Sequence, residues 1–334
     1  MIKQNKYKKN EELKKYNFKN NIKLIYITIL FLAFSVSNLV ASDISYDSKG
    51  TDFWLTFLPN FHNGRNAFPP EIPNDSLYIF ITSEVPTKGK ITFRNFSNQT
   101  FTQDFTITDP SKIYVFKRKY FDFELRGYND SGNNWSRNQN ETPAVQTFHI
   151  TSDDEVTVYA LSQAITTSDA FLVLPTDVLG DEYLIMSYNS DGLNAAGNSR
   201  TPSQFAIVAV EDNTKVMIKP TTETYSNGMN TQNITLQKGQ AYLVQARITS
   251  SNSTGDLTGT EIKSDKPIAV FAGHQRATVP VNANLTNPSR DFLVSQMPPI
   301  KTWGKNAFLV TYVQPTNIIR EGNDMFRILA AYDG

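Results

Sequence analysis

Beyond Gly50 the chain consists of short stretches in which apolar and polar positions alternate. Val, Ile, Thr, Tyr and Phe dominate these stretches, and Asn, Asp, Gly, Ser and Pro separate them, as in strands joined by turns. Typical stretches are SLYIFIT, GKITF, SKIYVF, DEVTVYAL, QFAIVAV, TKVMIKP and KPIAVFAG. No segment after residue 42 keeps a 3.6-residue apolar period over the length of a helix. The pattern predicts an all-β fold of the β-sandwich type rather than a parallel α/β sheet.

One phrase occurs twice, 112 residues apart. HITSDDEVTVYALSQ occupies residues 149–163 and EIKSDKPIAVFAGHQ occupies residues 261–275, with Ile, Ser, Asp, Val, Ala and Gln in register. The shared Ser-Asp pair and the shared Gln could carry chemistry that is needed at two sites. Alternatively, the phrase is part of a structural unit that the chain contains twice.

The neighbouring sequence favours the structural interpretation. Each phrase follows an opening strand and two hairpins and precedes a Pro-bearing link, which gives a unit of about 125 residues. The opening strands are FWLTFL, YLIMSY and FLVTYV. We therefore predict tandem β-sandwich-like repeats at 43–182 and 183–307, with 308–334 as the start of a truncated third repeat. In this interpretation Asp153 and Asp265 lie in turns that enter a strand.

The N-terminal 42 residues are typical of a secretory signal peptide. The first 23 residues hold eight lysines and two acidic residues, an apolar run follows at 24–36, and small residues surround position 41. The apolar run is short for a membrane span, although an uncleaved signal anchor is the alternative. We predict export to the cell surface or the medium, with no membrane span in the mature chain.

Charge and cysteine content exclude several classes of protein. Removing residues 1–42 takes eight basic and two acidic residues from a neutral chain, so the mature chain carries a net charge near -6. A mildly acidic chain without a basic cluster lacks the electrostatic pattern of a nucleic-acid-binding protein. The chain has no cysteine, so its stability must come from a large core rather than from disulfides.

Seven segments together resemble the IgGFc-binding protein N-terminal domain family: GTDFWLTFLPN, IFITS, TSDAFLVLPTDVLGDEYLIMSY, QFAIVAVEDNTKVMI, LTGTEIKSDKPIAVFAGHQ, DFLVSQMPPIKTWGKNAFLV and FRILAAYDG. The resemblance implies a non-catalytic adhesion or recognition protein, of the kind found in an animal mucus protein and in bacterial secreted or surface proteins. The leader rich in Lys and Asn is typical of a bacterial chain. Family members carry cysteines where this chain has Arg276 and Arg290, so the resemblance cannot imply a disulfide here.

The sequence contains no motif that indicates catalysis or metal binding. The three histidines lack the short spacing of a zinc site, and no cysteine can assist them. Adjacent acidic residues occur at 153–155, 181–182 and 211–212. A role in turns explains them more simply than a pair of catalytic carboxylates does. There is no GxSxG elbow and no phosphate-binding GxxxxGK. We predict no catalytic residues, no metal and no cofactor.

Two polar loops with aromatic residues are the candidate ligand-binding segments. The loop RGYNDSGNNWSRNQNETP carries Tyr128, Trp135 and Arg137, and the second aromatic loop runs over 60–75. Their aromatic side chains would either anchor a partner or fold back onto the core. His274, in AGHQ, follows a strand and is a further candidate, with a hydrogen-bonded residue at the end of a strand as the alternative.

We therefore predict a secreted or surface-displayed adhesion protein that binds an extracellular protein or glycan. The alternative is a carbohydrate-binding or carbohydrate-active module that uses loop aromatics and carboxylates.

Overall fold

The computed structural model describes residues 47–62, 75–127, 138–191, 201–249, 253–279, 290–310 and 325–332. Asp47–Gly334 forms one compact unit. The predicted signal peptide lies outside the described residues, so export stays a prediction. Within the described ranges, no helix is long and apolar enough to cross a membrane.

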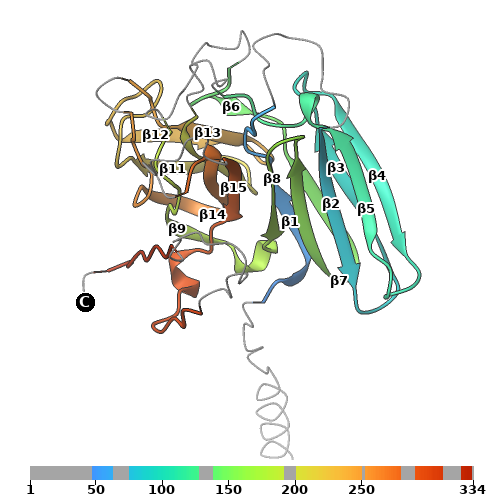
Figure 1. Ribbon diagram of the computed structural model, residues 1–334. Helices are drawn as coiled ribbons and strands as arrows, with labels where there is room; N and C mark the ends of the chain where they lie inside the picture. Colours follow the sequence, from blue (N-terminus) through green and yellow to red (C-terminus); the bar gives the residue numbers. More distant parts are fainter. Residues whose placement is uncertain are drawn as a thin grey trace, which may run out of the picture. The chain divides into compact units, whose positions relative to one another are not determined.

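The first sheet is built around the long strand β7, Phe148–Gln163. One side of the sheet has the order β4-β3-β7-β2-β5, while β1 and β8 pair with the opposite edge of β7 (Figure 1). We call this sheet A. Its other strands are β1 (Lys49–Leu55), β2 (Ser76–Ser83), β3 (Thr87–Arg94), β4 (Thr100–Ile107), β5 (Tyr114–Lys119) and β8 (Ser168–Val173).

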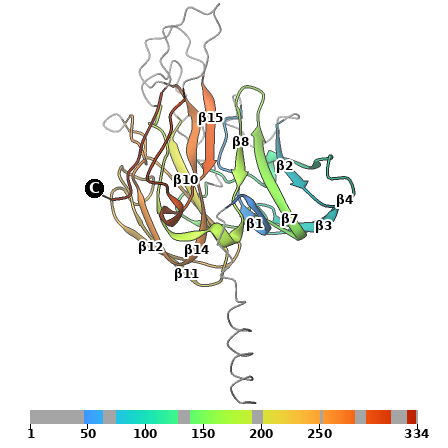
Figure 2. The same ribbon diagram turned by 90° about the horizontal axis from the view of Figure 1, so that it is seen from below.

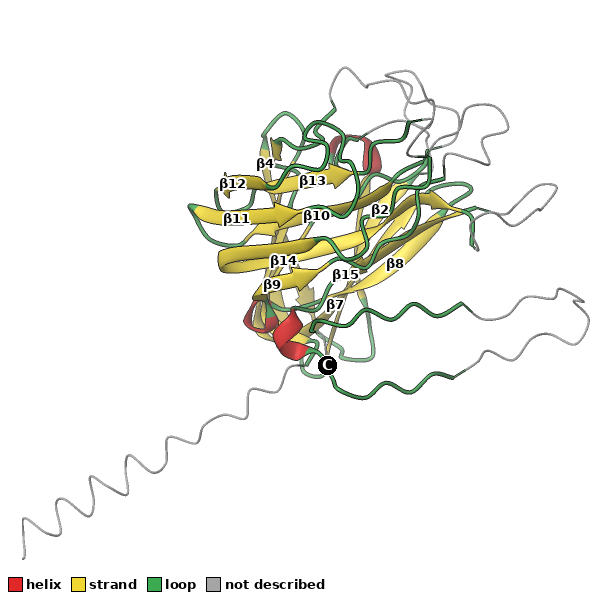
Figure 3. Ribbon diagram, turned by 90° about the vertical axis from the view of Figure 1, so that its left-hand side faces the viewer, coloured by secondary structure: helices red, strands yellow, loops and turns green. Residues whose placement is uncertain are grey.

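The second sheet, sheet B, is built in the same way around β14, Glu261–Ala277. Its other strands are β6 (Pro143–Ala144), β9 (Gly180–Leu184), β10 (Ser203–Ala209), β11 (Thr214–Lys219), β12 (Gln232–Leu236), β13 (Ala241–Gln245) and β15 (Asp291–Gln296). The helical elements that the structure describes are short 3₁₀ turns (Figure 3): η1 (Tyr120–Asp122), η2 (Thr176–Val178) and η3 (Ile300–Thr302). The all-β prediction is confirmed.

The two sheets have matching strand pairings. β14 pairs with β9, β10, β11 and β15, just as β7 pairs with β1, β2, β3 and β8. β11 pairs with β12 and β10 with β13, just as β3 pairs with β4 and β2 with β5. One strand, β6, is an addition to sheet B, where it pairs with β13.

The repeated Ser-Asp phrase marks an irregularity within each central strand. The register of β1 against β7 shifts between Thr151 and Val156, and that of β9 against β14 shifts between Lys263 and Ile268. The sequence predicted a turn that enters a strand, but the structure has a bulge inside one continuous strand. On one edge of each central strand the pairing partner changes at this bulge, from β3 to β2 in sheet A and from β11 to β10 in sheet B. The hydroxyls of Ser152 and Ser264 donate to backbone carbonyls there.

A shared hydrophobic core joins one face of sheet A to one face of sheet B. The rings of Phe171 on β8 and Phe271 on β14 meet edge to face, with centroids 5.6 Å apart. The edge strands β8 and β15 lie side by side (Figures 1 and 2), and carboxylates connect them. Asp291 accepts the backbone N–H of Ser168, and Asp169 accepts that of Val294, each at 2.9 Å. These bonds satisfy edge N–H groups that would otherwise be unpaired.

The opposite face of sheet B covers a second core. Its centre consists of apolar side chains from β10, β11, β13 and β14 together with Leu257 and Ala246 from the connecting segments. Residues 303–310 and 325–332 form no strand, and Phe308 is 95% exposed. The boundaries of the predicted repeats stay a prediction.

Candidate functional site

Both ends of the first predicted aromatic loop and the start of the second meet at one buried cluster. His62 and Asp75 flank residues 63–74 of the first loop. Glu124 comes shortly before residues 128–137 of the second loop, which lie outside the described residues. His62 Nδ1 lies 2.8 Å from Asp75 Oδ2, and His62 Nε2 lies 3.0 Å from Glu124 Oε1. We call His62, Asp75 and Glu124 the loop base. The predicted ligand-binding residues Tyr128, Trp135 and Arg137 lie outside the described residues.

The loop base is a buried ion cluster. The His62 side chain is only 7% exposed, and its ring stacks on Tyr120 with centroids 3.5 Å apart. Burial alone would lower the pKa of His62, but the charges and hydrogen bonds of Glu124 and Asp75 outweigh it and raise this pKa to about 9. Burial raises the pKa of Glu124, and the facing His62 opposes that effect.

This geometry indicates a structural role for His62 rather than general-base catalysis. Both ring nitrogens lie at hydrogen-bond distance from carboxylates, and the raised pKa keeps both protonated at neutral pH. A general base needs an unprotonated nitrogen that faces the substrate. Asn60 extends the cluster: its backbone N–H donates to Glu124 at 3.0 Å, and its side-chain amide donates to Ser162 Oγ at 3.0 Å.

Sheet B has a comparable buried ion pair at the ends of two other segments. Asp191 and Thr201 flank residues 192–200, and Arg290 follows residues 280–289. Arg290 Nε lies 3.0 Å from Asp191 Oδ2, and Thr278 Oγ1 donates to the same oxygen at 2.8 Å. Both charged side chains are less than a tenth exposed. Arg290 also donates to the carbonyl of Arg276 at 3.2 Å, so the two positions where the resembled family carries cysteines are in contact.

His274 lies inside this second cluster and is completely buried. Its Nδ1 accepts the backbone N–H of Arg276 at 3.0 Å, and its ring packs edge to face against Tyr188. Burial and the nearby charge of Arg290 lower the pKa of His274 to about 3, so this histidine is neutral at physiological pH. These contacts favour the structural alternative for His274, and its role in ligand binding stays a prediction.

Buried amide groups tie the C-terminal part of the second loop to sheet B. Asn140 donates to Gln245 at 2.6 Å, Gln245 to Gln204 at 2.8 Å, and Gln204 to the carbonyl of Pro59 at 2.8 Å. The neighbouring Glu141 accepts bonds from Thr224, Ser226, Asn227 and Gln232. The residues that flank 128–137 also bond each other: the backbone N–H of Gln139 donates to the carbonyl of Arg126 at 2.7 Å, and the backbone N–H of Arg126 donates to the side-chain oxygen of Gln139 at 2.9 Å.

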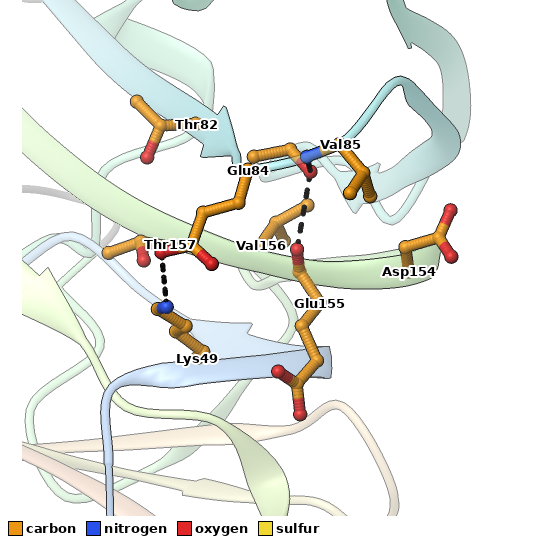
Figure 4. A pocket seen from close by; sticks show the side chains of 9 residues that line it. Lys49, Thr82, Glu84, Val85, Asp154, Glu155, Val156 and Thr157 are labelled. Carbon is orange, nitrogen blue, oxygen red and sulfur yellow. Dashed lines mark hydrogen bonds and ion pairs between the residues drawn. The ribbon is translucent and has the colours of Figure 1, made fainter. Parts of the chain in front are cut away.

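The irregularities of the central strands adjoin two shallow pockets. The pocket on sheet A has a volume of about 380 Å³ and is lined by Lys49, residues 82–85 and residues 154–157 (Figure 4). The pocket on sheet B has a volume of about 340 Å³ and lies beside Ser264 and Asp265. Asp265 accepts the backbone N–H of Lys215 at 2.8 Å. Among the described residues, no group of three His, Asp or Glu side chains is arranged to hold a metal ion.

Comparison with known proteins identifies a matching family and a human relative. Residues 169–334 match the model of a family described as IgGFc binding protein. A human IgGFc-binding protein is 26% identical over 187 residues, which cover 54% of this chain and 3% of that protein. No solved structure matches the chain. The family resemblance that the sequence indicated is confirmed.

Proposed function

We propose that this chain, whose residues 169–334 match the model of the IgGFc binding protein family, is an exported, non-catalytic adhesion protein. The carrying observation is the loop base, where one buried ion cluster holds both ends of the first aromatic loop and the start of the second. Rigid sheets that present variable loops are a common design for recognition, because the scaffold fixes the loops while their sequences specialise.

We propose that the ligand contacts the loops through Tyr128, Trp135 and Arg137. The hydrogen bonds between the flanking residues Arg126 and Gln139 support this proposal, since a loop whose ends are fixed loses less conformational freedom when it binds. His274 would act indirectly, by keeping the neighbouring cluster of Asp191 and Arg290 in place.

The matching strand pairings support the tandem-repeat interpretation of the chain. Residues 43–182 and 183–307 would then be two copies of one β-unit, and 308–334 would begin a third. The hydroxyl of Ser152 donates to the carbonyl two residues later at 2.7 Å, and that of Ser264 does the same at 2.6 Å. In this proposal a shared fold would account for the repeated phrase, and the segments that differ between the units would be free to carry specificity.

The proposed partner is an extracellular protein. The human relative is called an IgGFc-binding protein, which makes the Fc fragment of immunoglobulin G the first probe to test. A decisive experiment would immobilise Fc, Fab and a panel of extracellular glycoproteins, and would measure binding of the purified chain by surface plasmon resonance. The same chain would be applied to a glycan array.

Saturable binding to a protein probe that survives enzymatic removal of the glycans of that probe is the expected result. Binding to free glycans alone would replace the proposal with a carbohydrate-binding module. Turnover of a polysaccharide would overturn the non-catalytic role.

A further inference from the structure

The face of sheet A that points away from the shared core carries an apolar patch. Four neighbouring strands, β5, β2, β7 and β8, place side chains on it in two registered rows. The first row consists of Val115, Phe80, Tyr159 and Leu172, and the second of Lys117, Tyr78, Leu161 and Ala170. We call this surface the outer face.

The outer face is exposed to a degree that is unusual for large apolar side chains in the middle of a sheet. Val115 is 51% exposed and Tyr159 is 45% exposed. Tyr78 and Phe80 lie parallel to each other, with ring centroids 5.9 Å apart, and both remain partly exposed. Contiguous apolar patches of this kind on a soluble domain usually mark an interaction surface.

Sheet B shows what covers the corresponding face. Phe271 follows Tyr159 by the 112 residues that separate the repeated phrases, and it lies at the equivalent place in β14. Phe271 is completely buried, because its face of sheet B packs against Phe171 and the core of sheet A. The same face of the fold is thus covered by another sheet in one half of the molecule and exposed in the other.

The charges at the two ends of the outer face are opposite. Lys117 lies at one end, with its ammonium group 5.1 Å from the centre of the Tyr78 ring. Thr82 and Thr157 continue the face in the other direction and line the pocket on sheet A together with Glu84, Asp154, Glu155 and Lys49, whose ammonium group lies 2.5 Å from Glu84 (Figure 4). One end is therefore basic and the other has an excess of carboxylates.

We propose that the outer face binds the outer face of a second copy of this chain, in a two-fold symmetric dimer. A two-fold axis that lies between the faces and crosses the strands places the basic end of each copy against the acidic end of the other. Lys117 of each copy then approaches the carboxylates around Glu84 of its partner, and the apolar rows meet in the centre. Self-complementarity of this kind is the requirement for an isologous interface, and sheet-on-sheet packing is how this fold buries the equivalent face.

The test is sedimentation velocity of the purified chain over a concentration series, with four single variants. Tyr159→Glu introduces a carboxylate at the centre of the face and should raise the dimer dissociation constant at least about 10-fold. Met229→Glu changes an exposed apolar residue outside the outer face and should leave the dimer intact. Lys117→Glu and Glu84→Lys should each weaken self-association, because each brings like charges together twice across the interface.

Mixing the last two variants gives the sharpest result. A heterodimer of Lys117→Glu with Glu84→Lys restores both charge contacts, so the mixture should associate more strongly than either variant alone. Circular dichroism and thermal unfolding confirm that each variant is folded. A monomeric wild-type chain at all concentrations would overturn the proposal, and so would a dimer that Tyr159→Glu leaves unchanged or a mixture with no gain over its components.

Discussion

The charge of His62 should make the stability of the protein depend on pH in the alkaline range. Folding raises the pKa of this histidine from 6.5 to about 9, because Glu124 and Asp75 hold the imidazolium in a buried site. One pKa unit corresponds to about 1.4 kcal/mol, so this difference corresponds to about 3 kcal/mol. Since the folded-state pKa is the higher one, the stabilisation is complete below pH 6.5. It is lost as the pH rises through about 9.

Urea unfolding between pH 6 and pH 9.5 measures this loss. The wild-type free energy of unfolding should fall by about 3 kcal/mol across the window through this group. The variant His62→Gln has no imidazole to titrate, so it should be less stable than wild type at pH 6 and should lose less stability as the pH rises. A matched variant, His149→Gln, removes a histidine that lies 2.7 Å from Asp52 and should retain the steep dependence. NMR titration of the His62 ring should give a midpoint near 9, and a midpoint at or below 6.5 would refute the reasoning.

The sequence and the buried clusters lead to four other predictions. Intact-mass measurement of exported protein should show cleavage near residues 41–42, and a mature chain that still begins with the initiator methionine would contradict this. Arg290→Met should lower the free energy of unfolding by about 3 to 5 kcal/mol, because it leaves the carboxylate of Asp191 buried without its cation, and chemical denaturation would measure the loss. Once a ligand is known, Trp135→Ala should weaken binding about 5-fold to 150-fold in calorimetric titration with little loss of stability. Asp265→Ala should instead lower the melting temperature and leave the affinity of the folded fraction unchanged, and the reverse pattern would make the repeated phrase a site.

The sequence predicted where strands lie better than it predicted where a strand is interrupted. Alternation and turn residues located the all-β elements, because strands with one buried face record that burial in every second residue. The same signals suggested a turn at the Ser-Asp phrase, where the structure has a bulge within β7 and within β14. Local composition cannot distinguish a turn from a bulge, because in both the polar side chains form hydrogen bonds with backbone groups that lack a strand partner.

The loop base escaped prediction because its members are far apart in the chain. His62 and Glu124 are separated by 62 residues, and nothing in the sequence near either one signals the other. The sequence did indicate the loops at 60–75 and 126–143, through their aromatic and polar composition, but it treated them as separate candidates. The pairing of β1 and β2 with β7, and of β5 with β2, brings their ends together. A buried cation shared by two carboxylates stabilises that arrangement only while all three groups are present, so a change at His62 should disturb both loops at once.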